Sequence, residues 1–227
     1  MVKRNIQANR IFVAYPWRIY RAMWENLIAE WHKRYPLHFM AIGRDPGQPA
    51  AELLAKILDA LDHSSCAFLD ASGGNPNVSL EYGYAKSIMS ENDIYLFLDQ
   101  HSSTSSNPGS AIISDLAGTF ANQYTLDDKR LKESVEAIIF RHPYNRRFQQ
   151  FCRQRRYKGG PRRFLIRILR QLDGQDSILR RELLDRVTHE SRKSESYVDG
   201  YLKELHRGGL ITITRGNEYA SRITIAG

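Results

Sequence analysis

Apolar and polar positions follow two alternating patterns through the first half of the chain. Short apolar runs, each long enough for one buried strand, occupy residues 11–15, 37–42, 66–69 and 94–98. The segments between them, residues 17–31, 49–61 and 77–90, repeat apolar side chains at the spacing of a helix. Strands and helices that alternate in this way predict an α/β domain with a flavodoxin-like or Rossmann-like parallel sheet and helices on both faces.

The pattern is less regular after residue 98. Residues 100–110 are polar and rich in serine, which is typical of a loop. Residues 111–124 leave room for one more strand, and residues 126–140 have the periodicity of a closing helix. We therefore expect the first domain to cover residues 1–140.

The last part of the chain shows three helical patterns and then two alternating apolar segments. The helical patterns are residues 164–172, 178–187 and 194–206, and the alternating segments are residues 210–214 and 222–225. Residues 215–218, which lie between the last two segments, have the composition of a turn. Three helices followed by a β-hairpin is the order of a winged helix-turn-helix, so we predict a small α+β domain of that type over residues 164–227.

The composition is that of an ordinary globular protein, with 42% apolar residues. No apolar run approaches the roughly 18 residues of a membrane span, and no apolar signal segment follows the first residues. Cys66 and Cys152 match no metal or redox spacing, and the seven histidines form no metal-binding pattern. We therefore expect a soluble cytoplasmic protein without a metal site.

The positive charge lies entirely in the second half of the chain. Residues 1–126 hold 10 Lys and Arg against 12 Asp and Glu, whereas residues 127–227 hold 23 against 13. Ten arginines and one lysine, with no acid among them, lie between residues 141 and 170. Residues 141–163 are therefore expected to form a basic connector that contacts a polyanion such as a nucleic acid. The alternative is a solvated helical face, although such a face usually carries acids as well.

Residues 70–85 combine a strand end, a glycine turn and a helix start. Asp70 follows a buried strand, Asn75 is placed to be an N-cap, and Pro76 suits the first helical position. Ligands of open parallel sheets bind beyond the carboxyl ends of the strands, and a helix start offers free N–H groups to an anion. The segment is therefore predicted to form part of a ligand site.

Glu81 is unusual within this segment. Val78, Ala85 and Ile88 share its helical face, and an unpaired carboxylate on an apolar stripe is costly to bury. The pattern leaves two interpretations open: a functional carboxylate, or one that pairs with an arginine or sits at the rim of the stripe. Gly83 lies in the middle of the same helix, where glycine costs roughly 1 kcal/mol relative to alanine, and it indicates close approach by a backbone or a ligand.

These residues resemble the signature of the nucleoside 2-deoxyribosyltransferase superfamily and of the related TIR-like nucleotide-binding proteins of bacteria. The resemblance covers residues 10–125. It is carried by Asp70 with its small-residue turn, Asn75-Pro76-Asn77-Val78, Glu81-Tyr82-Gly83-Tyr84-Ala85, and Tyr15-Pro16 after the first strand. An N-glycosidase is the activity that the resemblance implies.

The resemblance also implies a role for each residue. Glu81 would attack or stabilise the anomeric carbon, and Asp70 would bind sugar hydroxyls or help to position the base. Tyr15 would line the sugar pocket and hold the Glu81 carboxylate, and Asn77 would contact the ribose or phosphate. The other substrate-binding residues would be Pro16, Ser72, Gly73, Asn75 and Gly83. A preorganised carboxylate suits this chemistry because cleavage builds positive charge on the sugar, and a covalent glycosyl–enzyme intermediate is the stronger version of the same idea.

The leaving group favours one class of substrate. Nicotinamide leaves NAD as a neutral molecule and needs no general acid, whereas a purine or pyrimidine leaves better when it is protonated. We therefore expect NAD or a related nucleotide as the substrate, with no cofactor required.

The predicted recognition helix, residues 194–206, and its surroundings supply the expected nucleic-acid contacts. They are Arg192, Lys193, Ser194, Ser196, Tyr197 and Lys203, with Arg215 and Asn217 at the wing and Arg153, Arg155, Arg156, Arg162 and Arg163 in the connector. Glu195, Asp199 and Glu204 dilute the charge of the helix. The alternative is a winged helix that binds protein or forms a dimer.

An N-glycosidase-like domain followed by a winged helix resembles bacterial anti-phage effector toxins, including deoxyribosyltransferase-like effectors that associate with a retron reverse transcriptase. That resemblance implies a toxin held on nucleic acid or on a defence-system protein, and we also expect a homo-oligomer. The alternative function is a nucleotide-sensing transcriptional regulator whose winged helix binds DNA. Nucleotide salvage by base exchange would explain the first half of the chain but not the basic half.

Overall fold

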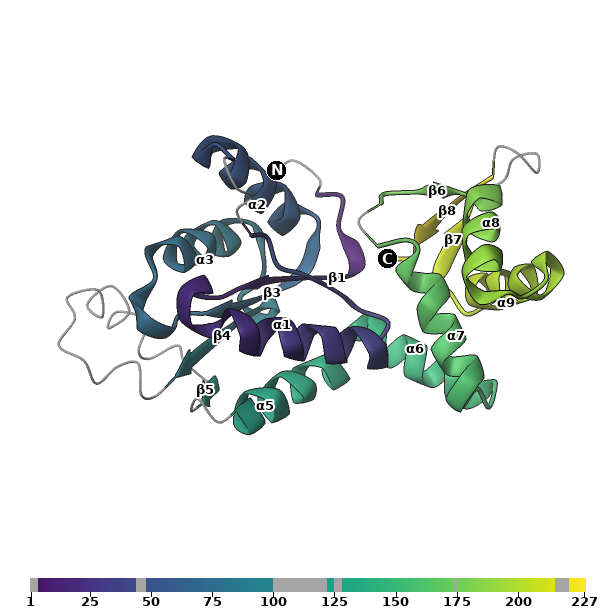
Figure 1. The fold of residues 1–227 in the computed structure, drawn as a ribbon, viewed down its shortest axis with the longest axis horizontal. Coiled ribbons are helices and arrows are strands. Elements are labelled where there is room, and N and C mark those ends of the chain that lie inside the picture. Colours follow the sequence, from purple (N-terminus) through teal and green to yellow (C-terminus); the bar gives the residue numbers. More distant parts are fainter. Residues whose placement is uncertain (1–3, 44–47, 100–121, 125–127, 174, 215–220) are drawn as a thin grey trace. The chain divides into compact units, whose positions relative to one another are not determined.

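The computed structural model describes residues 4–43, 48–99, 122–124, 128–173, 175–214 and 221–227 (Figure 1). The chain divides into two compact units. The first unit comprises residues 1–6, 10–30 and 39–140, and the second comprises residues 7–9, 31–38 and 141–227.

A five-stranded sheet has the strand order β2-β1-β3-β4-β5. Its strands are β1 (Gln7–Ala14), β2 (His38–Met40), β3 (Ser64–Asp70), β4 (Ile94–Asp99) and β5 (Asn122–Tyr124). Strand β4 pairs in parallel with both β3 and β5. The order 2-1-3-4 is that of flavodoxin-like folds, so the predicted α/β class with a parallel sheet is confirmed.

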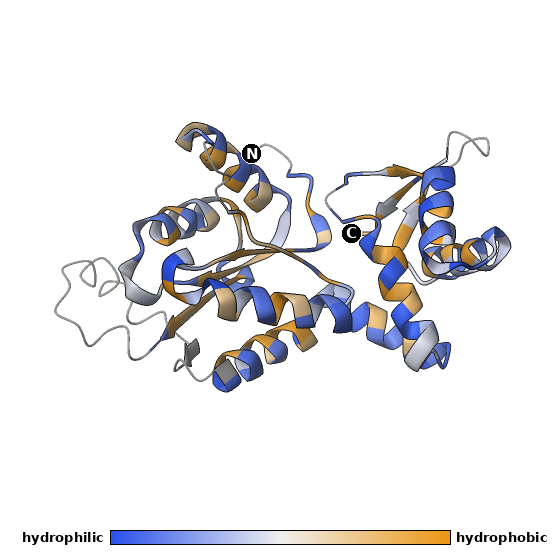
Figure 2. Ribbon diagram, in the orientation of Figure 1, coloured by the Kyte–Doolittle hydropathy of each residue, from blue (hydrophilic) through white to orange (hydrophobic). Residues whose placement is uncertain are grey.

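Helices alternate with these strands and cover both faces of the sheet. They are α1 (Trp17–Arg34), α2 (Ala50–Asp62), α3 (Pro76–Ile88) and α5 (Asp128–Arg141). Figure 1 shows α2 and α3 together on one side of the sheet, with α1 and α5 on the other. Both faces of the sheet are covered, which fits the apolar segments at residues 11–14 and 66–69 of its strands, orange in Figure 2, and Phe12, Phe68 and Phe97 are fully buried.

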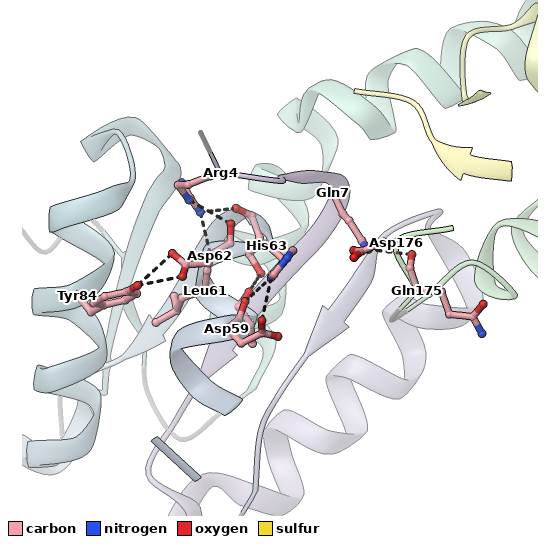
Figure 3. Close-up of polar contacts among 11 residues, drawn as sticks. Arg4, Gln7, Asp59, Leu61, Asp62, His63, Tyr84, Gln175 and Asp176 are labelled. Atoms are coloured by element: carbon pink, nitrogen blue, oxygen red, sulfur yellow. Dashed lines mark hydrogen bonds and ion pairs between the residues drawn. The ribbon is translucent and has the colours of Figure 1, made fainter. Parts of the chain in front are cut away.

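Arg4 ties the start of the chain to the ends of two helices (Figure 3). Its guanidinium donates to the carbonyl oxygens of Leu61 at 2.7 Å, Ile88 at 2.9 Å, Ser64 at 3.0 Å and Asp62 at 3.1 Å. The last carbonyls of a helix have no intrahelical partner, and a planar guanidinium can satisfy several of them at once. The Arg4 side chain therefore fixes the C-terminal ends of α2 and α3 against each other.

Two short early segments, residues 7–9 and 31–38, belong to the second unit and make polar contacts within it. The side-chain amide of Gln7 donates to the carbonyl oxygen of Gln175 at 3.0 Å and to the carboxylate of Asp176 at 3.1 Å (Figure 3). His38 lies 3.1 Å from a carboxylate oxygen of Asp173.

The rest of the second unit combines helices with a small antiparallel sheet of order β6-β8-β7. Its elements are α6 (Pro143–Gln154), α7 (Gly159–Arg170), β6 (Ile178–Leu179), α8 (Arg180–Ser191), α9 (Glu195–Arg207), β7 (Ile211–Ile213) and β8 (Arg222–Ile225). From α7 onward this is the element order predicted for a winged helix-turn-helix. The bounds differ in detail: α7 begins at Gly159, before the predicted residue 164, and residues 178–179 form a strand, because they pair with Ile223 and Arg222 of β8.

The segment expected as a basic connector, residues 141–163, is largely helical. It forms α6 and the first turn of α7. Tyr144, Phe148 and Phe151 are buried at helical spacing on one face of α6, so this helix belongs to a core. Residues 159–161, Gly-Gly-Pro, form the start of α7, where proline is tolerated because the first N–H groups of a helix need no intrahelical partner.

Across the described ranges, no helix is both long enough and apolar enough to span a membrane.

Candidate functional site

A cleft of about 980 Å³ opens in the first unit beyond the carboxyl ends of β1 and β3. Its walls come from the end of β1, the start of α1, one side of α2, and residues 72–81 at the start of α3. The cleft brings together seven of the predicted site residues: Tyr15, Pro16, Ser72, Gly73, Asn75, Asn77 and Glu81. Asp70 and Gly83 do not line it.

Glu81 is a buried carboxyl group in the cleft wall. It is 9% exposed, and no hydrogen bond or ion pair to its side chain is present among the described residues. Val78 and Ala85, on the same face of α3, are buried as well. Burial raises the pKa of Glu81 to about 8. The pairing with an arginine that the sequence left open is therefore not found in the described part of the chain.

Tyr15 presents a second polar group without a partner. The residue is 3% exposed, and its buried hydroxyl has no hydrogen-bond partner in the described structure. Its ring stacks on Trp17 and Trp24, with centroid distances of 5.6 and 5.8 Å. Burial raises the pKa of Tyr15 to about 12, so the hydroxyl keeps its proton and can donate to a ligand or to a carboxylate. No direct bond from Tyr15 to Glu81 is formed.

Asp70 is fully buried and acts on the site through other residues. The indole N–H of Trp24 donates to its Oδ2 at 2.7 Å, and the backbone N–H and hydroxyl of Ser72 donate to its Oδ1 at 3.1 and 2.5 Å. The Ser72 hydroxyl also accepts from the backbone N–H of Asp99 at 2.8 Å. Asp70 thus fixes Trp24, on which Tyr15 stacks, and the turn that leads to α3. Here it is a positioning residue, and sequence reasoning missed Trp24 as its partner.

We predict that Asp70→Asn lowers the free energy of unfolding by about 2 kcal/mol, because an amide can accept through only one of its two terminal atoms. Urea denaturation measures this, with Glu52→Gln, an exposed change in α2, as the control. A variant that keeps full stability but loses substrate binding would contradict the positioning role and favour direct contact with the sugar.

The turn before α3 has the local structure that its sequence predicts. The side chain of Asn75 caps the helix by accepting from the backbone N–H of Asn77 at 2.9 Å, and Pro76 occupies the first turn. Gly73 has a φ of +69°, which favours glycine. Gly83 is exposed, and a Cβ there would meet no described atom within 4 Å, so packing within the described chain does not require glycine at this position.

Two arginines and an apolar rim complete the cleft, and sequence reasoning missed them. Arg18 and Arg21, from the first turns of α1, line it, and Arg21 lies 4.8 Å from the ring centroid of Trp17. The three most exposed apolar side chains of the cleft are Ile19, Leu54 and Leu80, at 68%, 39% and 57% exposure. In the sequence, only their position at the start of the helix predicted after the first strand could have indicated that these arginines line the cleft.

Comparisons with protein-family models, with curated proteins and with solved structures find no match. The site is thus defined by its own geometry. Within the described ranges, no group of three or more His, Cys, Asp or Glu side chains could hold a metal ion. Cys66 is fully enclosed, and burial raises the pKa of its thiol, which disfavours the reactive thiolate.

The predicted nucleic-acid residues of the second unit fall into two groups. The side chains of the first group are bound to other residues of the chain. Ser194 caps α9 by accepting from the backbone N–H of Tyr197, and Lys203 pairs with Asp199 at 2.9 Å. Arg155 pairs with Glu204 at 3.1 Å, and Arg162 donates to the carbonyl oxygen of Arg34 at 3.0 Å. The exposed group comprises Arg153, Arg156, Arg163, Arg192, Lys193, Ser196 and Tyr197. Arg215 and Asn217 lie outside the described residues.

Proposed function

We propose that the first unit cleaves the N-glycosidic bond of NAD or a related nucleotide, with Glu81 acting on the anomeric carbon. The observation that carries this proposal is a buried carboxyl group without a described partner in the wall of a large cleft. Burying such a group is costly, and chains retain costly groups chiefly where function uses them. The resemblance of residues 70–85 to nucleoside 2-deoxyribosyltransferases supports the same assignment.

The chemistry follows from the charge that develops during cleavage. As the bond to the base breaks, its electron pair leaves with the base and positive charge builds on the sugar. The Glu81 carboxylate stabilises that charge or attacks the anomeric carbon to form an ester, which water then hydrolyses. A pKa of about 8 keeps much of the free protein's Glu81 protonated at neutral pH, and a cationic pyridinium nucleotide beside it would favour the ionised form.

The other groups in the cleft favour a phosphorylated substrate. Arg18 supplies positive charge, as does Arg21, which also pairs with Glu25 at 2.9 Å, and Asn77 at the start of α3 offers a side-chain amide. Trp17, which is partly buried, offers aromatic surface to a base or sugar, and the hydroxyl of the buried Tyr15 offers a hydrogen-bond donor. NAD combines in one molecule the phosphates, sugars and bases that these side chains would bind.

We predict that Arg18→Ala raises KM for NAD about fivefold with little change in kcat, because an exposed cation contributes similarly to ground-state and transition-state binding. Initial-rate measurements test this. Lys56→Ala, an exposed change on α2 outside the cleft, is the control and should leave both constants unchanged. A fall in kcat with unchanged KM would contradict a binding role for Arg18.

We extend the proposal to the second unit as a nucleic-acid anchor, because its basic segment carries exposed arginines without described acid partners. Together the two activities fit an anti-phage effector held on DNA, an RNA–DNA hybrid or a reverse transcriptase partner. A nucleotide-sensing regulator is the second candidate, favoured by the winged-helix order of elements from α7 to β8.

One experiment separates the two candidates. The purified chain is incubated with NAD, deoxynucleoside monophosphates and deoxynucleosides, with and without added nucleic acid, and released bases are identified by chromatography. Nicotinamide or nucleobase release that depends on Glu81 supports the N-glycosidase. Tight nucleotide binding without release of any base, under all of these conditions, overturns it and favours the sensor.

A further inference from the structure

A groove of about 670 Å³ runs along α9 in the second unit, and aromatic side chains form its wall. Tyr157, Tyr197 and Tyr201 line it. The ring centroids of Tyr197 and Tyr201 are 5.1 Å apart, those of Tyr157 and Tyr201 are 5.7 Å apart, and Phe164 of α7 lies within 5.5 Å of both α9 tyrosines. Tyr197 is 42% exposed, so part of this aromatic surface faces solvent.

The floor of the groove is a glycine inside a helix. Gly200 lies in the middle of α9, and a Cβ at this position would meet no described atom within 4 Å. Glycine in a helix interior costs roughly 1 kcal/mol relative to alanine, and no packing within the described chain requires it here. The space above Gly200 is therefore open to close approach by a ligand.

The charges around the groove are predominantly positive. Arg155, Lys203 and Arg207 line it together with one acid, Glu204, which pairs with Arg155 at 3.1 Å and with Arg207 at 2.9 Å. Lys193, at the start of α9, lies 5.6 Å from the ring centroid of Tyr197. An acidic ligand is thus favoured, and its contacts would combine cations with aromatic faces.

These features do not suit readout of duplex DNA by α9. Lys203 is held by Asp199 at 2.9 Å, and Ser194 is used as the helix cap, so two of the side chains expected to reach base edges are engaged within the helix. Aromatic rings next to cations are instead the arrangement that binds unstacked bases and their phosphates.

We propose that this aromatic groove binds single-stranded nucleic acid, with bases stacked on Tyr197 and Tyr201. The nucleic-acid backbone lies along Arg155 and Arg207, which share a single acid, Glu204. The inference deepens the nucleic-acid part of the proposed function. It does not depend on N-glycosidase activity, because binding is measured without turnover.

The test is fluorescence anisotropy with the full chain and a labelled oligothymidine of about 20 nucleotides, compared with a duplex of the same length at several salt concentrations. We expect the single strand to bind at least about 10-fold more tightly than the duplex, and Tyr197→Ala to raise its Kd about 10-fold. Tyr197→Phe retains the aromatic face and should stay within about twofold of wild type.

Two further variants keep the result interpretable. Gly200→Leu fills the floor while leaving every tyrosine and cation in place, and it should weaken single-strand binding as much as Tyr197→Ala does. Phe140→Ala removes an exposed aromatic ring outside the groove and should change nothing. Equal or tighter binding of the duplex, or unchanged single-strand binding in both Tyr197→Ala and Gly200→Leu, overturns the inference. Release of base from NAD should be the same in Tyr197→Ala and wild type.

Discussion

Glu81→Gln is expected to lower the rate of base release about 10³-fold or more while the protein stays folded. Glutamine has the shape of a protonated glutamate and fits the same wall of α3, but it cannot ionise. It therefore cannot stabilise positive charge at the anomeric carbon or form an ester with it. Glu81→Gln should lower kcat as well as kcat/KM, because the positive charge on the sugar develops only in the transition state.

The measurement is single-turnover release of nicotinamide from NAD, or of the base that the substrate screen identifies. Glu52→Gln makes the same chemical change at an exposed position of α2 and should keep full activity. Because the ionised carboxylate is required, kcat/KM of the wild type should rise with pH and level off above about 8. Residual activity in Glu81→Gln within about 10-fold of wild type would assign the chemistry to another group.

The α/β layers could be predicted because buried parallel strands have an unambiguous pattern. Residues 11–14 of β1 and 66–69 of β3 are apolar and buried, and the helices between the strands have clear periodicity. The strand that precedes α8 was missed because Ile178 and Leu179 become a strand only through pairing with β8, which is a contact distant in sequence.

In residues 141–163, a high arginine content made the buried face of α6 hard to recognise from composition. Their many arginines indicate a solvated connector, yet Tyr144 and Phe148 are spaced four residues apart and Phe151 follows after three more. That spacing is an apolar helical face, and long arginine side chains can flank such a face without disturbing it.

The positions of site residues could be predicted where the neighbouring sequence determines the local structure. Asn75 and Pro76 start α3 by capping rules, and the strand-end position of Tyr15 follows from the order of the elements. The bond from Trp24 to Asp70 joins residues 46 positions apart, so no local pattern contains it. The resemblance implied that Asp70 binds sugar hydroxyls or helps to position the base; in the structure its oxygens accept from Trp24 and Ser72.

Glu81→Gln is also expected to stabilise the protein, by an amount that grows with pH. The pKa of Glu81 is about 8 in the folded protein and near 4.5 when it is unperturbed. Below pH 4.5 the carboxyl is protonated in both folded and unfolded chains, so the two variants should be equally stable. Between pH 4.5 and 8 only the unfolded chain gives up the proton, which disfavours the wild-type fold by about 1.4 kcal/mol per pH unit. Above pH 8 both states are ionised and the difference becomes constant.

At pH 7 the variant should therefore unfold with a free energy about 3 kcal/mol above wild type, whereas at pH 4.5 the two should differ by less than about 0.5 kcal/mol. Urea denaturation at both pH values measures this, with Glu52→Gln, a change at an exposed position of α2, as the control. The same stabilisation at both pH values would mean that packing, not the buried charge, sets the difference. Lost activity together with a pH-dependent gain in stability is what a carboxylate retained for function, at a cost to the fold, should produce.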